Sequence, residues 1–369
     1  LTVCTPDTGT MLRDCGPAEV GWGVGDKLYL ADHRQLTKAQ VPTFPYPVVR
    51  GIVPGVIDEG ETVEIASVSG HVYTLTAPTV YAHLGARRPD VSLRFLPWVA
   101  NQTRSIVFKS EDPNGTRFHF MFSQRADVDL RYVEFQDCGR TQVTNIAVSH
   151  STTWSGSTPT FISNEDDQIG RYCVHGHHVF GPVTPSQPSG YQFNLTGLSV
   201  HGNFGRSGIA IHNASYGMVE ESVVVDGDGA GLVHEDGSEK HNKFYHNFVA
   251  SVNPPAITLF GTENPTDGAA ESEADPFQRK GNCVWFRAQA ELDFQHNVCV
   301  NTREGLDFSS GTQEGANCTN CPTLIIRLPN APGLDTTVNA NVTLTQPLFT
   351  VPAVFDDNEV VSTTEFGLG

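Results

Sequence analysis

Short apolar triplets, each following a glycine or another small residue, recur along this chain at a nearly regular spacing. The repeated position falls at Val174, Ile209, Leu232, Ile257, Val284 and Leu306, with steps of 35, 23, 25, 27 and 22 residues. A second series lies half a repeat earlier and begins at Leu198, Ser222, Phe248 and Val298. A period of about 22–25 residues with two or three short strands per repeat is typical of a right-handed parallel β-helix. The spacing therefore predicts an all-β chain built around such a helix.

Composition agrees with this fold class and narrows the possible partners. The 369 residues include 35 Gly and 23 Pro and only 17% charged residues, which is a poor composition for a helical protein. The net charge of −18 predicts no nucleic-acid partner, because such binding needs a positive face. An apolar stretch of about 18 residues is lacking, which predicts no membrane span. The chain begins at Leu1, as expected of a processed or trimmed protein.

The cysteines predict an oxidising compartment. Their even number, eight, suits four disulfides in a secreted protein. Pairing by neighbourhood gives Cys4–Cys15, Cys138–Cys173, Cys283–Cys299 and Cys318–Cys321. Half of a zinc site or a redox motif is the alternative for Cys318 and Cys321. The disulfide interpretation is favoured for them because a second CxxC pair is missing from the sequence.

Potential N-glycosylation sites point to the same compartment. Six Asn-x-Ser/Thr sequons occur, at Asn101, Asn114, Asn194, Asn213, Asn317 and Asn341. We expect all six to carry glycans, because such acceptors lie on the surface of secreted proteins. Disulfides and sequons together predict a secreted, extracellular glycoprotein.

A column of histidines and one carboxylate is the candidate functional site. Alternation along strands aligned at Val174, Ile209 and Leu232 puts four side chains on one face. These four are His175, His177, His212 and Glu235. The same alternation sends Ile211 and His234 to the opposite, core-facing side.

Three interpretations of this column stay open. Glu235 and His212 could act as a general acid–base pair on a glycosidic bond, with Arg206 and Arg171 holding a uronate. Alternatively, His175, His177 and His212 could ligate a divalent metal, although the sequence makes no cofactor certain. Stacked polar ladders also occur in β-helices for structural reasons alone, without any ligand.

Several ordered blocks resemble the G8-domain proteins. Residues 170–177, 200–212 and 232–247 resemble the right-handed β-helix of this family, and residues 118–139 resemble its first coils. Trp22–Asp26, Val72–Pro78 and His83–Gly85 resemble the G8 module itself. The family includes the cell-migration-inducing hyaluronan-binding protein, its transmembrane relative and the fibrocystin-like proteins. This chain departs from the usual pattern at Cys173, where relatives carry Pro, and at Gly176, where they carry an aromatic residue.

The resemblance implies a domain organisation and two competing functions. We expect a G8-like β module over residues 1–103, the β-helix over 104–310 and a C-terminal cap or extension over 311–369. The first function is binding or depolymerising a hyaluronan-like extracellular polysaccharide, as a hyaluronidase-like enzyme would. The alternative is a non-enzymatic structural glycoprotein of a matrix, cell coat or filament, with other copies of the chain as partners.

Overall fold

A computed structural model describes most of the repeat region and part of the remainder. The described residues are 21–34, 58–70, 72–83, 97–141, 170–179, 190–203, 205, 207–235, 239, 241–253, 281–287, 292–309 and 353–363, together with the backbone of seven strands outside these ranges. Those strands are β4 (Ala86–Arg87), β5 (Leu93–Phe95), β11 (Ser151–Ser155), β12 (Thr158–Ile162), β26 (Leu324–Arg327), β27 (Asn341–Leu344) and β30 (Phe366–Leu368).

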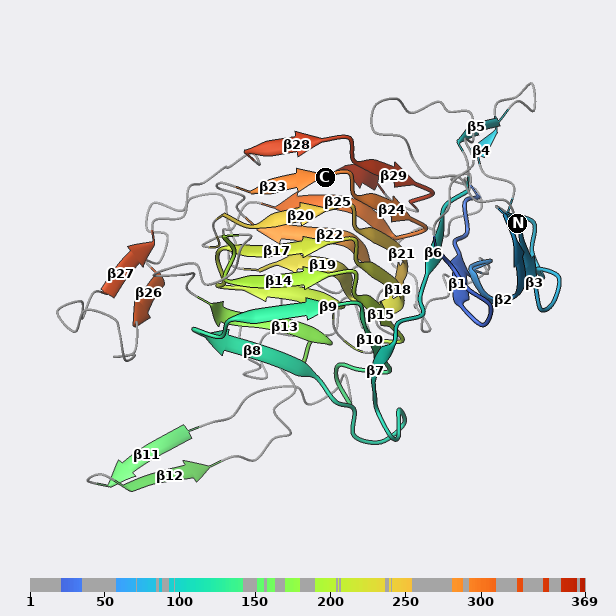
Figure 1. The fold of residues 1–369 in the computed structure, drawn as a ribbon. Helices are drawn as coiled ribbons and strands as arrows, with labels where there is room; N and C mark the ends of the chain where they lie inside the picture. The colour runs from blue at the N-terminus through green and yellow to red at the C-terminus, as the bar shows by residue number, and fades with distance from the viewer. Residues whose placement is uncertain are drawn as a thin grey trace, which may run out of the picture.

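Three parallel sheets wind around a common core, as a right-handed β-helix requires (Figure 1). Sheet 1 contains β30 and six further strands: β8 (Phe120–Gln124), β13 (Val174–Val179), β16 (Ile209–His212), β19 (Ala230–His234), β22 (Asn282–Arg287) and β25 (Glu304–Ser309). Sheet 2 contains β9 (Val128–Arg131), β14 (Phe193–Thr196), β17 (Gly217–Glu220), β20 (Lys243–Tyr245), β23 (Asp293–Gln295) and β28 (Val354–Asp356). Sheet 3 contains β7 (Ile106–Lys109), β10 (Val133–Gln136), β15 (Ser199–His201), β18 (Val223–Asp228), β21 (Phe248–Asn253), β24 (Val298–Val300) and β29 (Glu359–Val361).

Except at Ile257, the register confirms both repeat series. In sheet 1, Val174 pairs with Ile209, which pairs with Leu232. Val284 then pairs with Leu306 in the same column. In sheet 3, the series that begins at Leu198 aligns through Ser199, Val223, Phe248 and Val298.

Three features of the fold differ from the sequence prediction. Leu232 pairs directly with Val284, so the expected coil at Ile257 does not lie between them, and Ile257 itself is outside the described residues. One edge of β19 pairs with β16, so only the other edge is open to a further strand, and β22 pairs there. The β-branched run Asp129–Phe135 has the sequence pattern of one strand but forms two, because Tyr132 has φ of 52°, which turns the backbone. The β-helix also continues past residue 310, since β28, β29 and β30 pair with β23, β24 and β25.

Like residues stack inside the coils. Phe244, Phe294 and Phe355 occupy successive register positions of sheet 2, and the last two rings stack at 5.9 Å. Between sheets 2 and 3, Nδ2 of Asn247 donates to Oδ1 of Asn297 at 2.9 Å. Nδ2 of Asn297 donates to Oδ1 of Asn358 at 3.0 Å. This asparagine ladder satisfies buried polar groups at a turn that repeats in every coil it crosses.

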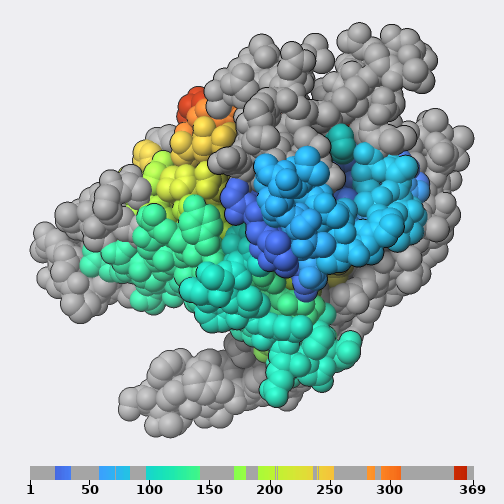
Figure 2. All heavy atoms as spheres, turned by 45° about the vertical axis from the view of Figure 1, so that its right-hand side comes forward, coloured from blue at the N-terminus to red at the C-terminus, as the bar shows by residue number. Residues whose placement is uncertain are grey.

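The N-terminal module is a separate antiparallel sheet with the order β3-β2-β1-β6. Its strands are β1 (Lys27–Leu30), β2 (Glu61–Ser69), β3 (Val72–Leu75) and β6 (Val99–Asn101). The β-branched runs Thr62–Val68 and His71–Leu75 have the sequence pattern of an antiparallel ribbon, and β2 pairs antiparallel with β3. In Figure 2 the module is the block of blue spheres lying against the coils.

This module covers the outer face of sheet 3. Tyr29, Ala31 and Ala100 pack against valines of that face, among them Val223 and Val225. Nε1 of Trp98 also donates to Glu359 Oε1 at 2.9 Å. Burial on both faces explains why the covered runs Val223–Val225 and Val298–Val300 of sheet 3 are continuously apolar, as in other parallel sheets.

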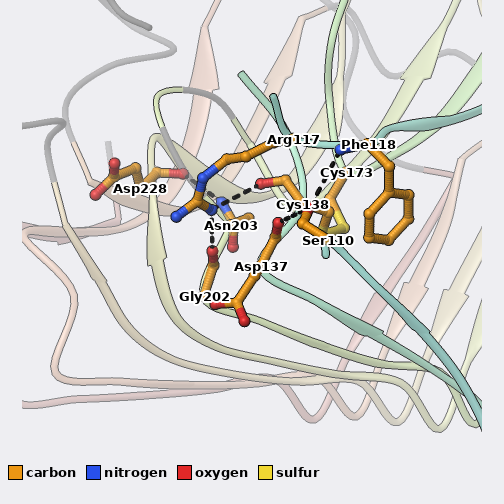
Figure 3. The surroundings of a disulfide bond; sticks show 9 residues. All are labelled: Ser110, Arg117, Phe118, Asp137, Cys138, Cys173, Gly202, Asn203 and Asp228. Carbon is orange, nitrogen blue, oxygen red and sulfur yellow. Dashed lines mark hydrogen bonds between the residues drawn. A yellow bond between two sulfur atoms is a disulfide. The ribbon is translucent and has the colours of Figure 1, made fainter. Parts of the chain in front are cut away.

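Two of the four disulfide predictions fall on described residues, and both are confirmed. Cys138 bonds to Cys173, and Cys283 bonds to Cys299. Figure 3 shows Arg117 beside the first of these bonds, where its Nη1 donates to the carbonyl of Gly202 at 2.8 Å. The Cys138–Cys173 bond therefore ties the first coil to the start of β13. Cys4–Cys15 and Cys318–Cys321 lie outside the described residues.

The asparagines of the sequons differ in how exposed their side chains are. Asn114 is exposed, and Asn101 is partly buried in β6, where its Nδ2 donates to Asp26 at 2.7 Å. Asn194 and Asn213 are 1% and 6% exposed, which argues against a glycan on either, because a linked sugar needs an accessible amide. Asn341 lies in β27, and Asn317 lies outside the described residues.

Candidate functional site

Strands β13, β16 and β19 bring the four predicted side chains together on the outer side of sheet 1. His177 pairs with His212 in register. The backbone N–H of Glu235 donates to the carbonyl of Ile211 at 2.9 Å, so Glu235 follows His212 in the same row. His175 lies two residues before His177 on the same face of β13. The predicted juxtaposition is confirmed.

The imidazoles form one compact cluster. The ring centroids of His177 and His212 are 4.9 Å apart, and those of His175 and His177 are 5.0 Å apart. The rings of His175 and His212 lie nearly parallel, 5.7 Å apart with 4° between their planes. One ring nitrogen from each of the three residues lies within 4.8 Å of the others. Three nitrogens this close can converge on one ion.

His175 is held in a fixed orientation. Its side chain is 0% exposed, and its Nδ1 donates to the carbonyl of Gly170 at 2.9 Å. This hydrogen bond assigns the proton to Nδ1, and Nε2 has no hydrogen-bond partner. Burial above all, and then the neighbouring His212, hold the pKa of His175 well below its ordinary value. The ring is therefore neutral at physiological pH, with a lone pair on a buried nitrogen.

Glu235 is fixed between two side chains. The hydroxyl of Tyr172 donates to Glu235 Oε1 at 2.6 Å. The other oxygen, Oε2, lies 3.6 Å from Nδ1 of His212, whose side chain is 26% exposed. Glu235 itself is buried. A carboxylate beside an accessible imidazole is an arrangement that can move protons.

A β-bulge adds a fourth histidine to the cluster. The register of β13 against β8 shifts between His177 and Val179, and His178 has φ of 54°. The rings of His177 and His178 stack with centroids 4.0 Å apart. Simple alternation predicts that His178 points inward, so the sequence gives no signal for its place here.

The opposite face of the same strands is core, as predicted. Ile211 and His234 are 0% exposed, and His234 accepts a hydrogen bond at Nε2 from Asn242 Nδ2 at 2.9 Å. Gly176 also faces the core, where a Cβ would lie 3.0 Å from the ring of Phe122. Phe122 of the preceding coil thus fills the space beside Gly176.

Of the two predicted arginines, only Arg171 is among the described residues. Arg171 is partly buried and directly precedes Tyr172 in the chain. Arg206 lies outside the described residues, so its predicted contact with substrate stays a prediction. Tyr172 was missed by sequence reasoning, because it precedes β13 and its contact with Glu235 spans 63 residues.

The chemistry of the cluster is limited by its donor groups. Imidazole nitrogens suit zinc, copper, nickel or iron, whereas calcium and magnesium prefer oxygen ligands. Without an ion, Glu235 and His212 offer a proton donor and acceptor beside each other. The geometry therefore supports both functional interpretations of the column.

Comparisons with known proteins agree with the fold and with this location. A family model described as the CEMIP β-helix matches residues 163–310, the segment that carries all four predicted site residues. Fibrocystin-L of Mus musculus is 24% identical over 276 residues, which cover 66% of this chain. The chain spans only 6% of the length of that relative. Residues 163–310 therefore match the β-helix of the CEMIP family model, and the chain is similar to a small part of fibrocystin-L.

Proposed function

We propose that this chain is an extracellular protein that binds and depolymerises a hyaluronan-like polysaccharide at the histidine cluster of sheet 1. The observation that carries the proposal is the Tyr172–Glu235–His212 arrangement, in which a fixed carboxylate lies beside a partly exposed imidazole. The match to the CEMIP β-helix supports the class of substrate.

The arrangement fits cleavage of a glycosidic bond. Such cleavage requires a group that gives a proton to the leaving oxygen, and a carboxyl is the usual donor. Glu235 has this role in our proposal, and His212 exchanges the proton with it. Arg171, beside Tyr172, is the described cation nearest in sequence to the cluster, and Arg206 stays the second candidate for binding a uronate.

Two observations support an extracellular setting. The two disulfides of the described core join cysteines that are 35 and 16 residues apart, and such bonds persist in oxidising compartments. Within the described ranges, no helix is long and apolar enough to cross a lipid bilayer. Secretion and glycosylation at Asn114 belong to the proposal.

The test is depolymerisation of high-molecular-mass hyaluronan, followed by size-exclusion chromatography with light scattering. We expect Glu235→Gln to lower the rate by about 10²–10⁴, the usual contribution of a positioned proton-transfer group. Glu111→Gln is the matched control. Glu111 is exposed and lies far from Glu235 in the sequence, so we expect this variant to keep the wild-type rate of depolymerisation.

The outcomes separate the parts of the proposal. Undiminished turnover in Glu235→Gln removes Glu235 from the chemistry. Binding of hyaluronan in affinity electrophoresis without any cleavage refutes the enzymatic half. A wild-type chain that neither binds nor cleaves refutes the whole proposal.

A second candidate function, assembly of a structural filament, rests on the two ends of the described β-helix. Within the described strands, β7, β8 and β9 have a neighbour on one side only, and so do β28, β29 and β30. Apolar side chains are open at both ends, including Phe108 and Phe355, each 43% exposed. When a second copy stacks head to tail on the same axis, the apolar end of one copy meets the opposite apolar end of the other. The edge strands of the two copies then pair at this contact.

Sedimentation velocity over a range of concentrations tests this alternative. Assembly predicts a sedimentation coefficient that rises with concentration in the wild type and stays constant in Ile106→Lys, at the exposed edge strand β7. Val80→Lys, which changes an exposed valine of the N-terminal module, is the control and assembles normally. A wild type that is monomeric at every concentration contradicts the filament.

A further inference from the structure

We propose that His175, His177 and His212 form a binding site for one late first-row divalent ion, with zinc as the probe. This inference goes beyond the polysaccharide proposal and does not depend on it. It rests on the convergence of three imidazole nitrogens and on the way in which two of the rings are oriented by their neighbours.

His175 has the hydrogen bonding of a metal-ligating histidine. In metal sites, one ring nitrogen usually donates to a carbonyl or carboxylate while the other binds the ion. Here Nδ1 donates to Gly170, and Nε2 is buried without a hydrogen-bond partner. A buried acceptor without a hydrogen-bond partner is unfavourable, and an ion bound at Nε2 satisfies it.

His212 has a carboxylate in the corresponding position. Glu235 Oε2 faces its Nδ1 at 3.6 Å, which directs the other nitrogen, Nε2, away from the carboxylate. Tyr172 holds that carboxylate through its second oxygen. A carboxylate at this position that closes to hydrogen-bond distance orients the histidine ligand and makes it more basic. Glu235 and Tyr172 are therefore positioning residues of the proposed site.

The spacing fits ion binding after small side-chain rotations. Two nitrogens that bind zinc tetrahedrally at about 2.05 Å lie about 3.3 Å apart. The three nitrogens are within 4.8 Å now, and His177 and His212 are partly exposed, so their rings have room to turn. Three protein ligands leave one zinc position for water or for His178, which stacks on His177.

A purely structural ladder explains the cluster less well. Ladder residues satisfy one another, as Asn247 and Asn297 do between sheets 2 and 3. His175 and His212 instead stack with parallel planes, and Nε2 of His175 donates and accepts no hydrogen bond.

The experiment uses the full chain, stripped with a chelator and dialysed, and titrated with zinc chloride by calorimetry. We expect about one ion per chain with a dissociation constant in the micromolar range or below. Cobalt(II) at the same site gives visible d–d absorption bands, which zinc then abolishes. Calcium leaves those bands unchanged, because the proposed ligands are nitrogens.

Variants connect the binding to the named residues. His177→Ala removes one ligand at a partly exposed position and is expected to lower the zinc affinity by roughly 100-fold or more. Glu235→Gln and Tyr172→Phe lower it about 10–100-fold, as loss of an orienting partner does. His241→Ala is the matched control, since this exposed histidine packs on Tyr216 away from the cluster, and it retains wild-type affinity.

The inference is overturned by a wild-type chain without stoichiometric binding, or by His177→Ala with unchanged affinity. Circular dichroism of each variant shows whether it is folded. Because the readout is metal binding alone, its failure is distinct from failure to bind or cleave hyaluronan.

Discussion

The hydroxyl of Tyr172 and the carboxylate of Glu235 are hydrogen-bonded at 2.6 Å although 63 residues separate them. Tyr172 lies just before β13, and Glu235 lies just after β19, with β16 between these strands in sheet 1. The bond therefore spans three adjacent coils and fixes the carboxylate beside His212. Both residues are buried, so the contact is shielded from water.

Removing this hydroxyl is expected to destabilise the fold. Tyr172→Phe should lower the free energy of unfolding by about 1.5–3 kcal/mol, because it takes a donor from a buried charged acceptor. Urea unfolding of the purified variant measures this change. Tyr132→Phe, at a 52% exposed ring, is the control and should change stability by less than about 0.5 kcal/mol. Equal values for the two variants contradict a stabilising role for the bond.

Loss of the Cys138–Cys173 bond is expected to have a larger effect. Its ends are 35 residues apart, and closing a loop of this length stabilises a fold by about 4 kcal/mol in the chain-entropy treatment. The double variant Cys138→Ala with Cys173→Ala should lose roughly that amount in the same urea assay. A change below about 1 kcal/mol would show that the unfolded chain is already constrained in this region.

Gly176 and Phe122 are expected to be coupled. A Cβ at position 176 would lie 3.0 Å from the Phe122 ring, so Gly176→Phe should cost about 1–3 kcal/mol by overpacking. Phe122→Ala alone leaves a cavity and should cost about 3–5 kcal/mol. Combining the two should recover at least about 1 kcal/mol relative to the sum of the single effects. Strict additivity in a double-mutant cycle would contradict their contact between the adjacent strands β8 and β13.

Acid is expected to destabilise the N-terminal module through His33. Burial lowers the pKa of His33 to about 4. The Nε2 of His33 accepts a hydrogen bond from the backbone N–H of Trp98, and only the neutral ring can accept it. His33 binds a proton near pH 6.5 in the unfolded chain and only near pH 4 in the folded chain. Stability should therefore fall as the pH drops through this window, by about 3 kcal/mol in all.

The matched variant for this prediction is His33→Gln, which lacks the titrating group. Urea unfolding at pH 7, 5.5 and 4.5 should show a smaller loss of stability in the variant than in the wild type. The charged groups facing His33 are His83, which lowers its pKa, and Asp32, which raises it. Identical pH slopes in wild type and variant would exclude His33 as the source.

Much of the candidate site could be predicted from the sequence. The alternation of side chains along a strand is a local property of the backbone, so aligning Val174, Ile209 and Leu232 was enough to place His175, His177, His212 and Glu235 on one face. Neighbourhood in the chain likewise gave the correct partners for Cys138 and Cys283.

The errors have a common physical cause. Ile257 matches the local pattern of a coil, but hydrogen bonding along the edge of β19 selected the strand at Val284 instead. Tyr132 carries no sequence signal for the turn that divides β9 from β10. The predicted end of the β-helix at residue 310 was too early because the last coil is completed by strands beyond residue 353.

The sequence by itself determined the repeat, the phase of each strand and the face on which the histidines lie, because these depend on local backbone geometry. Only the tertiary structure decided that His178 joins the cluster through a bulge, that Tyr172 holds Glu235, and that the N-terminal module covers sheet 3. Those contacts join residues distant in the chain. They depend on which strands pack together, and this is set by the free energy of the whole fold.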